Sequence, residues 1–375
     1  MLGVSLKMLF GDKAKFLSLV IGLAFAVLLI AQQGAFFLGL MLMATGPLQN
    51  VVQPDIWVCN PNTQYIFEVR PLNEKSLPRV RSVPGVAWAE PFLSSRVQLE
   101  MADGKFKAVQ MIGIDRNTLI GQPWGMLEGS IDDLRAPDAV LVEDSSRAKL
   151  GGARVGDSLK LNDRRAVIVG VCRAKLGWES NALVYTTYDN ALSFAPVGRD
   201  RLPFILVKAK EGEDVEQVAR RIASMTGLGA FPSRVMAWNT IDYILRETGI
   251  GMNFGFTVLL GFIVGLVVVG AIFHQFVLEN IRNFAVFKAM GASSWGLIRM
   301  VLLQAIVVGG IGFGIGVGLT GAFALSTRKP GSPLQAHFPW QLLVVALMAM
   351  LVCVGMGSLL SLRRVLRLEP AVVFK

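Results

Sequence analysis

The sequence predicts an α-helical membrane protein that has four transmembrane helices, one before and three after a large α+β extracytoplasmic domain. Composition supports the membrane class: the 375 residues are 53% apolar and 17% charged, and their mean hydropathy is +0.52. In an average soluble domain about a quarter of the residues are charged. Four long stretches lack Asp, Glu, Lys and Arg, and a segment of ordinary polarity separates the first two.

The uncharged stretches predict where the transmembrane helices lie. Each is longer than the ~20 residues that cross a bilayer, and they cover 16–54, 248–278, 300–327 and 330–362. Within them we expect transmembrane helices at 16–44, 251–278, 300–325 and 340–362. The first apolar run far exceeds the hydrophobic region of a cleaved signal peptide. We therefore expect a retained helix that continues beyond the bilayer as a stalk.

Lysine and arginine predict the orientation of the chain. Ten of them flank the spans on one side, in the segments 1–15, 279–299 and 363–375, whereas the loop 326–339 has two. Because positively charged loops stay in the cytoplasm, we expect both termini there and 45–250 on the opposite side. Residues 1–15 then form a cytoplasmic interfacial segment, whose first ten residues are either a helix on the leaflet or the start of the first span. The outer segment holds 25 basic and 24 acidic residues, so the net charge of +10 reflects topology and indicates no nucleic-acid partner.

The outer segment 45–250 is long enough for its own hydrophobic core and predicts mixed α and β structure. Alternating apolar residues around turn residues indicate two hairpins, at 96–111 and 158–171. A strand–helix–strand order is expected twice, first at 55–58, 73–83 and after Val86, and again where the strand 204–207 precedes a helix within 212–227. Two such units around inserted hairpins predict a two-lobed domain. The segment 238–247 is either a juxtamembrane helix or a second stalk.

Residues that carry catalytic chemistry are scarce. The outer segment contains no His and no Gly-x-Ser-x-Gly motif, and we interpret its acidic pairs, Asp132-Asp133 and Glu143-Asp144, as solvated loop carboxylates. Three cysteines are too few for a disulfide framework or a metal cluster, and we expect Cys59 and Cys172 to be buried thiols rather than a disulfide. The chain also lacks the Gly-x-x-x-x-Gly-Lys-Ser/Thr phosphate-binding loop. We therefore expect no enzyme, no metal site and no cofactor in this chain.

The loop 279–299 has the most informative pattern. Residues 279–290 can form a helix with Phe284, Phe287 and Met290 on one side. Gly291 suits the left-handed position that ends a helix, and Ser293 or Ser294 can cap the helix that follows. The loop is either an interfacial turn or a rigid two-helix elbow that binds a cytoplasmic protein.

This loop resembles a segment of the FtsX-like permeases, the membrane subunits of ABC systems of the MacB, LolC and DevC type. Residues 287–293, Phe-Lys-Ala-Met-Gly-Ala-Ser, match the family's E-x-G-I-L-K-A-L-G-A-S segment, with Ala285-Val286 where the family has Gly-Ile. The tail 363–371 is similar to the family's closing R-x-x-P-x-x-A-L-R pattern. The order of spans, one before a large outer domain and three after it, is also the family's.

The resemblance implies the permease subunit of an ABC exporter that works by mechanotransmission in the bacterial inner membrane. A separate cytoplasmic ATPase would bind ATP and Mg and move the periplasmic domain, so that a lipid, lipoprotein or amphiphilic substrate is exported. A membrane-fusion adaptor and an outer-membrane channel are further expected partners. The residues expected to couple the permease to the ATPase are Glu279, Arg282, Phe287, Lys288, Ala289, Met290, Gly291, Ala292 and Ser293.

Two alternatives to export stay open from the sequence. Within the same family, a signalling permease activates a periplasmic cell-wall hydrolase without transport. A ligand sensor is disfavoured because the longest cytoplasmic stretch has about twenty residues, too few for an output module.

Small and polar residues in the spans suggest helix packing. Gly310, Gly314 and Gly318 recur every four residues, a spacing that lets helix backbones approach closely. They are expected to pack either within the chain or against a second copy. Gln32 and Gln33 either bond to a neighbouring helix or lie where the first helix leaves the lipid. The resemblance implies a dimer, and we expect a homodimer rather than a heterodimer.

Overall fold

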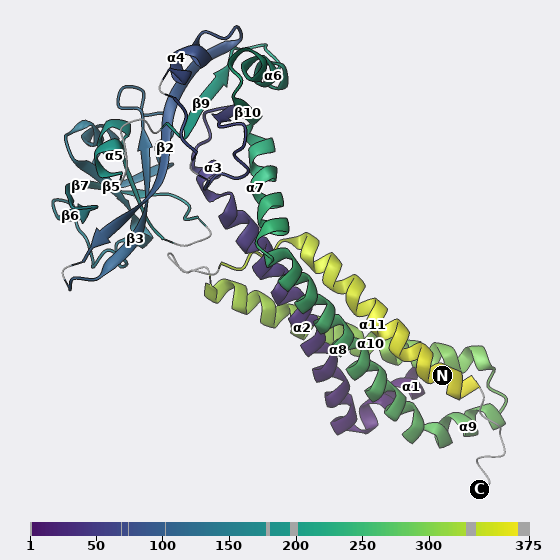
Figure 1. The fold of residues 1–375 in the computed structure, drawn as a ribbon. Helices are drawn as coiled ribbons and strands as arrows, with labels where there is room; N and C mark the ends of the chain where they lie inside the picture. Colours follow the sequence, from purple (N-terminus) through teal and green to yellow (C-terminus); the bar gives the residue numbers. More distant parts are fainter. Residues whose placement is uncertain are drawn as a thin grey trace. The chain divides into compact units, whose positions relative to one another are not determined.

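The computed structural model describes residues 2–68, 70–73, 75–101, 103–177, 181–195, 202–327 and 335–366. The chain forms two compact units, whose elements are labelled in Figure 1. The helical unit comprises Met1–Gly39, Ile250–Arg328 and Leu334–Lys375, and the α/β unit comprises Leu40–Gly249 with Lys329–Pro333. Parts of the predicted loop 326–339 and tail 363–375 lie outside the described residues.

Six helices make up the helical unit. They are α1 (Leu2–Gly11), α2 (Lys13–Ala44), α8 (Ile250–Glu279), α9 (Ile281–Ala289), α10 (Ser294–Thr327) and α11 (Trp340–Leu366). Among the described residues, three helical segments are long and apolar enough to cross a membrane: Phe16–Ala44, Ile250–Ala271 and Trp295–Thr327. A helix satisfies its own backbone hydrogen bonds, as lipid requires. The predicted fourth span falls on α11, whose described apolar part, Trp340–Met356, is shorter.

Glycines allow two helices to approach α2 closely. A Cβ atom at Gly316 of α10 would lie 2.7 Å from the carbonyl oxygen of Ala24, and one at Gly265 of α8 would lie 2.6 Å from the Cβ of Ala26. Real side-chain atoms do not pack at these distances, so both positions require glycine. In contrast, a Cβ atom added at Gly310, Gly314 or Gly318 would have no neighbour within 4 Å. Helix α10 therefore packs on α2 through glycines that lie outside the predicted stripe.

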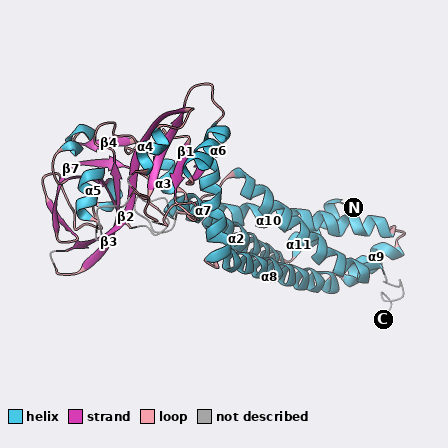
Figure 2. Cartoon of the chain, turned by 45° about the horizontal axis from the view of Figure 1, so that its top comes forward, coloured by secondary structure: helices cyan, strands magenta, loops and turns pink. Residues whose placement is uncertain are grey.

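The first lobe of the α/β unit is a four-stranded antiparallel sheet in the order β10–β1–β9–β2. Its strands are β1 (Ile56–Cys59), β2 (Val86–Glu100), β9 (Phe204–Ala209) and β10 (Gly229–Pro232). Helix α4 (Ser76–Arg81) connects β1 to β2, and α6 (Val215–Thr226) connects β9 to β10. Each connection skips one strand, so the lobe contains two split β-α-β units. Figure 2 shows these helices and strands in separate colours.

Side chains alternate between the two faces of this sheet, as the pleat requires. Ile56 and Val58 pack with Ile222 of α6 on one face, whereas Trp57 and Cys59 pack with Met236 on the other. Met236 belongs to α7 (Ser233–Glu247), and the short helix α3 (Gly46–Asn50) contributes Leu48 to the same cluster. Helices α3 and α7 thus cover the face of this sheet that lies opposite α4 and α6.

The second lobe is inserted between β2 and β9. It contains β3 (Phe106–Ile114), β4 (Gly125–Glu128), β5 (Ala139–Glu143), β6 (Ser158–Leu161), β7 (Arg164–Arg173), β8 (Ala182–Thr187), α5 (Tyr188–Phe194) and the 3₁₀ turns η1 (Ile131–Arg135) and η2 (Asp144–Ser146). The pairs β2–β3, β3–β8, β8–β5, β5–β7, β7–β6 and β6–β2 close a six-stranded barrel around an apolar interior. Both predicted hairpins are confirmed, as β2–β3 and β6–β7.

Two predictions about buried groups have different outcomes. Cys59 and Cys172 are free, buried thiols, as expected. Burial raises the pKa of Cys59 to about 12 and that of Cys172 further, which suppresses the reactive thiolate. The prediction of a solvated Glu143 is wrong, because its side chain is buried and accepts hydrogen bonds from Ser145 and Ser146. This carboxylate caps the turn η2, where its burial is stabilised by four donors.

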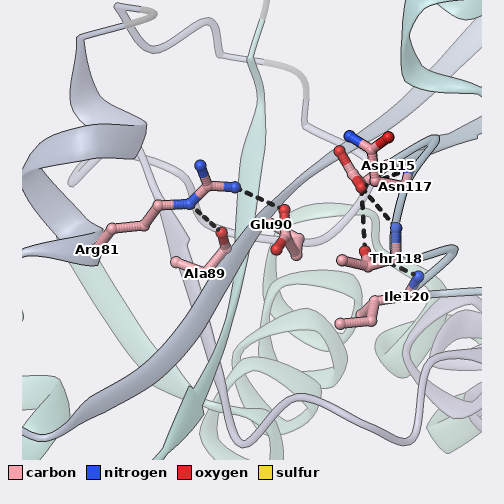
Figure 3. A network of polar contacts seen from close by, with 7 residues as sticks. All are labelled: Arg81, Ala89, Glu90, Asp115, Asn117, Thr118 and Ile120. Atoms are coloured by element: carbon pink, nitrogen blue, oxygen red, sulfur yellow. Dashed lines mark hydrogen bonds and ion pairs between the residues drawn. The ribbon is translucent and has the colours of Figure 1, made fainter.

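Glu90 is a second buried carboxyl, in β2 (Figure 3). It accepts a 2.7 Å hydrogen bond from Arg81, whose Nε donates to the carbonyl of Ala89. Asp115 follows β3 and accepts hydrogen bonds from the backbone N–H groups of the next turn. Burial raises the pKa of Glu90 above its ordinary value, Arg81 lowers it in part, and the charge of Asp115 raises it.

This shift predicts that Glu90 makes stability depend on pH. Because the pKa is higher in the folded chain than in the unfolded one, the ionised side chain opposes folding once the pH rises through this range. We expect the free energy of unfolding of Glu90→Gln, relative to the parent, to increase as the pH rises from about 4 to about 7. Chemical unfolding of the full chain in detergent measures this difference.

The variant Glu211→Gln is the matched control, since it removes one exposed carboxylate from the same unit. An unfolding difference for Glu90→Gln that stays constant over this pH range would contradict the prediction.

Candidate functional site

The predicted elbow between α8 and α10 has a defined end. Helix α9 runs from Ile281 to Ala289, and Gly291 has a φ of +90°. The N–H of Ala292 donates to the carbonyl of Phe287 (2.9 Å), and the N–H of Gly291 donates to that of Lys288 (3.1 Å). These two bonds are the Schellman pattern, which satisfies the last carbonyls of a helix. The predicted role of Gly291 as the residue that ends the helix is confirmed.

Helix α10 begins directly after this turn. The hydroxyl of Ser293 accepts a 3.2 Å hydrogen bond from the N–H of Gly296, in the first turn of α10. Ser293 is therefore the cap, of the two serines that the sequence offered. Only three residues, Met290, Gly291 and Ala292, separate the end of one helix from the cap of the next, so the elbow has little freedom to bend.

One side of α9 is buried against the rest of the helical unit. Phe284 and Ala285 are fully buried, and Phe287 packs on the same apolar cluster. That cluster includes Leu9 of α1 and Val301 of α10. Truncation of a buried Phe typically costs about 3–5 kcal/mol, so this side holds α9 firmly in place.

The other side of α9 is open. Arg282 and Asn283 are exposed, as are Val286 and Met290, at 39% and 68%. The prediction that Met290 shares a side with Phe284 and Phe287 is wrong, because α9 ends at Ala289 and the chain turns before the next helical position. The exposed position of Val286 was not among the sequence predictions, which placed Phe284, Phe287 and Met290 by helical spacing.

The remaining predicted coupling residues divide between these two sides. Ala289, Gly291 and Ser293 are exposed, whereas Lys288 and Ala292 are half-buried. Glu279 ends α8 and accepts a 3.1 Å hydrogen bond from Gln275. We define the elbow surface as the exposed residues Arg282, Asn283, Val286, Ala289, Met290 and Gly291. It combines apolar side chains with a cation, which suits a protein partner.

The other predicted packing residues lie elsewhere in the helical unit. Gln32 and Gln33 are half-buried in α2, and neither makes a side-chain hydrogen bond within the described part of the chain. The structure therefore gives no interhelical bond for them there. Gly310, Gly314 and Gly318 form an open stripe along α10.

Tryptophans lie at two of the helix ends. Trp295 is 60% exposed in the first turn of α10, and the guanidinium of Arg299 lies 5.9 Å from its ring. Trp340 is 68% exposed at the start of α11. Exposed tryptophans with a neighbouring cation are typical of the membrane–water interface.

Within the α/β unit, the end of α3 is bonded to the second lobe. The side-chain amide of Asn50 donates to the carbonyl of Lys175 (2.8 Å) and accepts from its N–H (2.7 Å). A Cβ atom at Gly46 would lie 2.6 Å from the carbonyl oxygen of Leu176, so the two backbones touch. This contact fixes α3 to the segment that directly follows β7.

The start of α7 is bonded to the first lobe. The hydroxyl of Ser233 donates to the carbonyls of Pro54 and Asp55, and the hydroxyl of Thr240 accepts from the N–H of Ile66 (3.2 Å). The ring of Tyr243 stacks on that of Tyr65, with centroids 4.1 Å apart. Helices α3 and α7 are thus fixed to loops of the α/β unit by hydrogen bonds and to its core by apolar packing.

Comparisons with known proteins match both halves of the chain. The description "MacB-like periplasmic core domain" matches residues 16–225, more than half of the chain, and "FtsX-like permease C-terminal" matches residues 255–370. A Mycobacterium tuberculosis protein named an uncharacterized ABC transporter permease is 25% identical over 319 residues, which cover 81% of this chain and 79% of the relative.

Two further similarities cover parts of the chain. The macrolide export ATP-binding/permease protein MacB of Salmonella typhi is 24% identical over 190 residues, 47% of this chain and 28% of that protein. The periplasmic region of MacB from Actinobacillus actinomycetemcomitans aligns with 53% of this chain and 96% of its own, at 16% identity and a TM-score of 0.39. With both family regions present in order, the chain belongs to the ABC transporter permeases of MacB and FtsX type.

Proposed function

We propose that this permease transmits ATP-driven movement from a cytoplasmic ATPase to its outer domain, and that the elbow surface is where the ATPase binds. The observation that carries the proposal is the asymmetry of α9. Phe284 is sealed against the helical unit, whereas Val286 and Met290 are exposed next to Arg282. An amphipathic helix held on one side and open on the other presents its open side to a partner groove.

The proposed orientation places the elbow and both termini in the cytoplasm and the α/β unit in the periplasm. The excess of lysine and arginine in 1–15, 279–299 and 363–375 supports it. Trp295 with Arg299 would then mark the cytoplasmic interface, and Trp340 the periplasmic one. In this arrangement α11 is the fourth span.

The proposed path of the movement is α2. This helix belongs to the helical unit as far as Gly39 and to the α/β unit from Leu40. It is followed by α3, whose Asn50 is bonded to the backbone of Lys175 in the second lobe. A displacement of α2 along or across its axis would therefore move the second lobe with it.

The proposed substrate is a lipid, lipoprotein or other amphiphile, exported with a membrane-fusion adaptor and an outer-membrane channel. Support comes from the family and from the relative named as a macrolide export protein. ATP and Mg are assigned to the separate ATPase because the sequence lacks a phosphate-binding loop.

A charge placed on the elbow surface should weaken ATPase binding. Met290→Asp replaces an exposed apolar side chain at the centre of the proposed contact. We expect the affinity for the partner ABC ATPase to fall by about tenfold or more, and stimulation of its ATP hydrolysis to fall with it. Titration of the ATPase onto the permease in nanodiscs measures the first quantity.

The control is Met225→Asp, which makes the same change at a methionine that is 56% exposed in α6. It should leave both quantities unchanged. Lys288→Glu is expected to act in the same direction as Met290→Asp. If Met290→Asp and Lys288→Glu bind and stimulate the ATPase as the parent does, the elbow is not the coupling site.

We also propose that two copies of the chain associate through the open glycine stripe of α10. Gly312 and Gly316 contact α2, whereas a Cβ atom at Gly310, Gly314 or Gly318 would meet no atom within 4 Å. Small residues every four positions on a free face of a membrane helix favour close packing with another helix. A second copy offers the same stripe by symmetry.

Gly314→Leu should separate the copies. Its side chain would enter open space within one chain but would prevent close approach of two α10 helices. We expect the dissociation constant of the dimer to rise by at least about tenfold, measured by single-molecule photobleaching in vesicles at a series of dilutions. Gly255→Leu, in α8 at a glycine whose added Cβ would likewise meet no atom within 4 Å, is the control. Equal dimer fractions for the two variants would contradict this interface.

A further inference from the structure

The segment between α10 and α11 touches the backbone of α2. A Cβ atom at Gly39 would lie 1.7 Å from the carbonyl oxygen of Gln335 and 3.2 Å from the backbone nitrogen of His337. No residue other than glycine fits at that distance without displacing the segment. The N–H of His337 also donates a 2.9 Å hydrogen bond to the carbonyl of Ala35, one helical turn earlier.

The same segment is fixed to α10 and α11. The N–H of Ala336 donates to the hydroxyl of Thr327, the last residue of α10 (3.2 Å). Its methyl group is buried in a small cluster with Ala35, Ala324 and Leu342, which come from α2, α10 and α11. The segment therefore cannot leave α2 without breaking contacts to all three helices.

Aromatic packing extends this contact. The ring of Phe36 meets that of Phe323 edge to face, with centroids 5.3 Å apart. Phe338 packs on the same cluster. Such dense packing resists deformation and transmits displacements between its members.

The contact lies at a particular place on α2. Gly39 is the last residue that α2 contributes to the helical unit, and Leu40 belongs to the α/β unit. A force applied to α2 at Gly39 thus acts where the helix passes from one unit to the other.

We propose that residues 335–338 transmit the movement of α10 and α11 to α2 through the backbone contact at Gly39 and Ala35. This proposal rests on the proposed function, because it concerns the movement that the ATPase drives. The small residues Ala35 and Gly39 are positioning residues in this scheme. Their small size lets the backbone of residues 335–338 contact the backbone of α2 directly. Longer side chains at this contact would change conformation under load and transmit less of the movement.

Two variants break the contact in different ways. Gly39→Ala forces the 335–338 segment away from α2. His337→Pro removes the N–H that bonds to Ala35 and puts the ring Cδ in place of that hydrogen, against the Ala35 carbonyl. Their controls are Gly321→Ala in α10, whose Cβ would meet no atom within 4 Å, and His337→Ala, which keeps the N–H.

The measurement is the distance between two spin labels in the permease–ATPase complex in nanodiscs. The labels are introduced by Asp103→Cys in the β2–β3 turn and Leu325→Cys near the end of α10, both at exposed positions, while the native cysteines are buried. Pulsed electron paramagnetic resonance gives the distance distribution without nucleotide and with ATP and vanadate. ATP hydrolysis is followed in the same samples.

We expect ATP with vanadate to shift the distance in the parent, Gly321→Ala and His337→Ala. Gly39→Ala and His337→Pro should lose most of that shift while ATPase stimulation is retained, because the elbow surface is unchanged. Shifts in both variants that equal the parent's would overturn the proposal and leave the proposed function standing. Absence of any shift or stimulation in the parent would overturn the proposed function, and this inference with it.

Discussion

Close contact between helix backbones along α2 is the interaction on which the rest of the structure depends. In the helical unit, α8 and α10 approach α2 through Gly265 and Gly316, and the 335–338 segment touches it at Gly39. In the α/β unit, Gly46 follows α2 and lies against the backbone of Leu176. In lipid no hydrophobic effect drives helices together, so contacts of this kind carry much of the packing energy. They also hold α2 close to α8 and α10 in the helical unit.

The elbow has a buried side that anchors α9 and an exposed side that we propose binds the ATPase. Phe284 is buried in the cluster that also contains Leu9 of α1, so the amino-terminal helix helps to seat α9 rather than only lying on the membrane. Gly291 and Ser293 complete the elbow by ending one helix and capping the next. A surface fixed in this way can pass a partner's displacement to α8 and α10, because it does not absorb the displacement by bending.

Sequence reasoning succeeded where a local pattern determines the structure. Uncharged runs predict membrane helices because charge is costly in lipid, and the Asn162-Asp163 turn predicts a hairpin because both residues tolerate positive φ. It failed where contacts between segments far apart in the sequence determine the structure. The closure of the barrel by β6 on β2 depends on a pairing of residues about sixty positions apart. Gly39 carries no periodic signal, and the burial of Glu143 is evident only from its hydrogen bonds with Ser145 and Ser146, whose turn it caps.

The central claim is that the ATPase binds the elbow surface of α9, and amide hydrogen exchange tests it most directly. The exchange of residues 279–293 would be compared in the nanodisc-embedded permease alone and with the ATPase bound. We predict slower amide exchange at the exposed end of α9 and at Gly291 in the complex, and unchanged exchange in α6 of the α/β unit. Equal exchange of residues 279–293 in the two samples, with the ATPase shown to be bound, would contradict it.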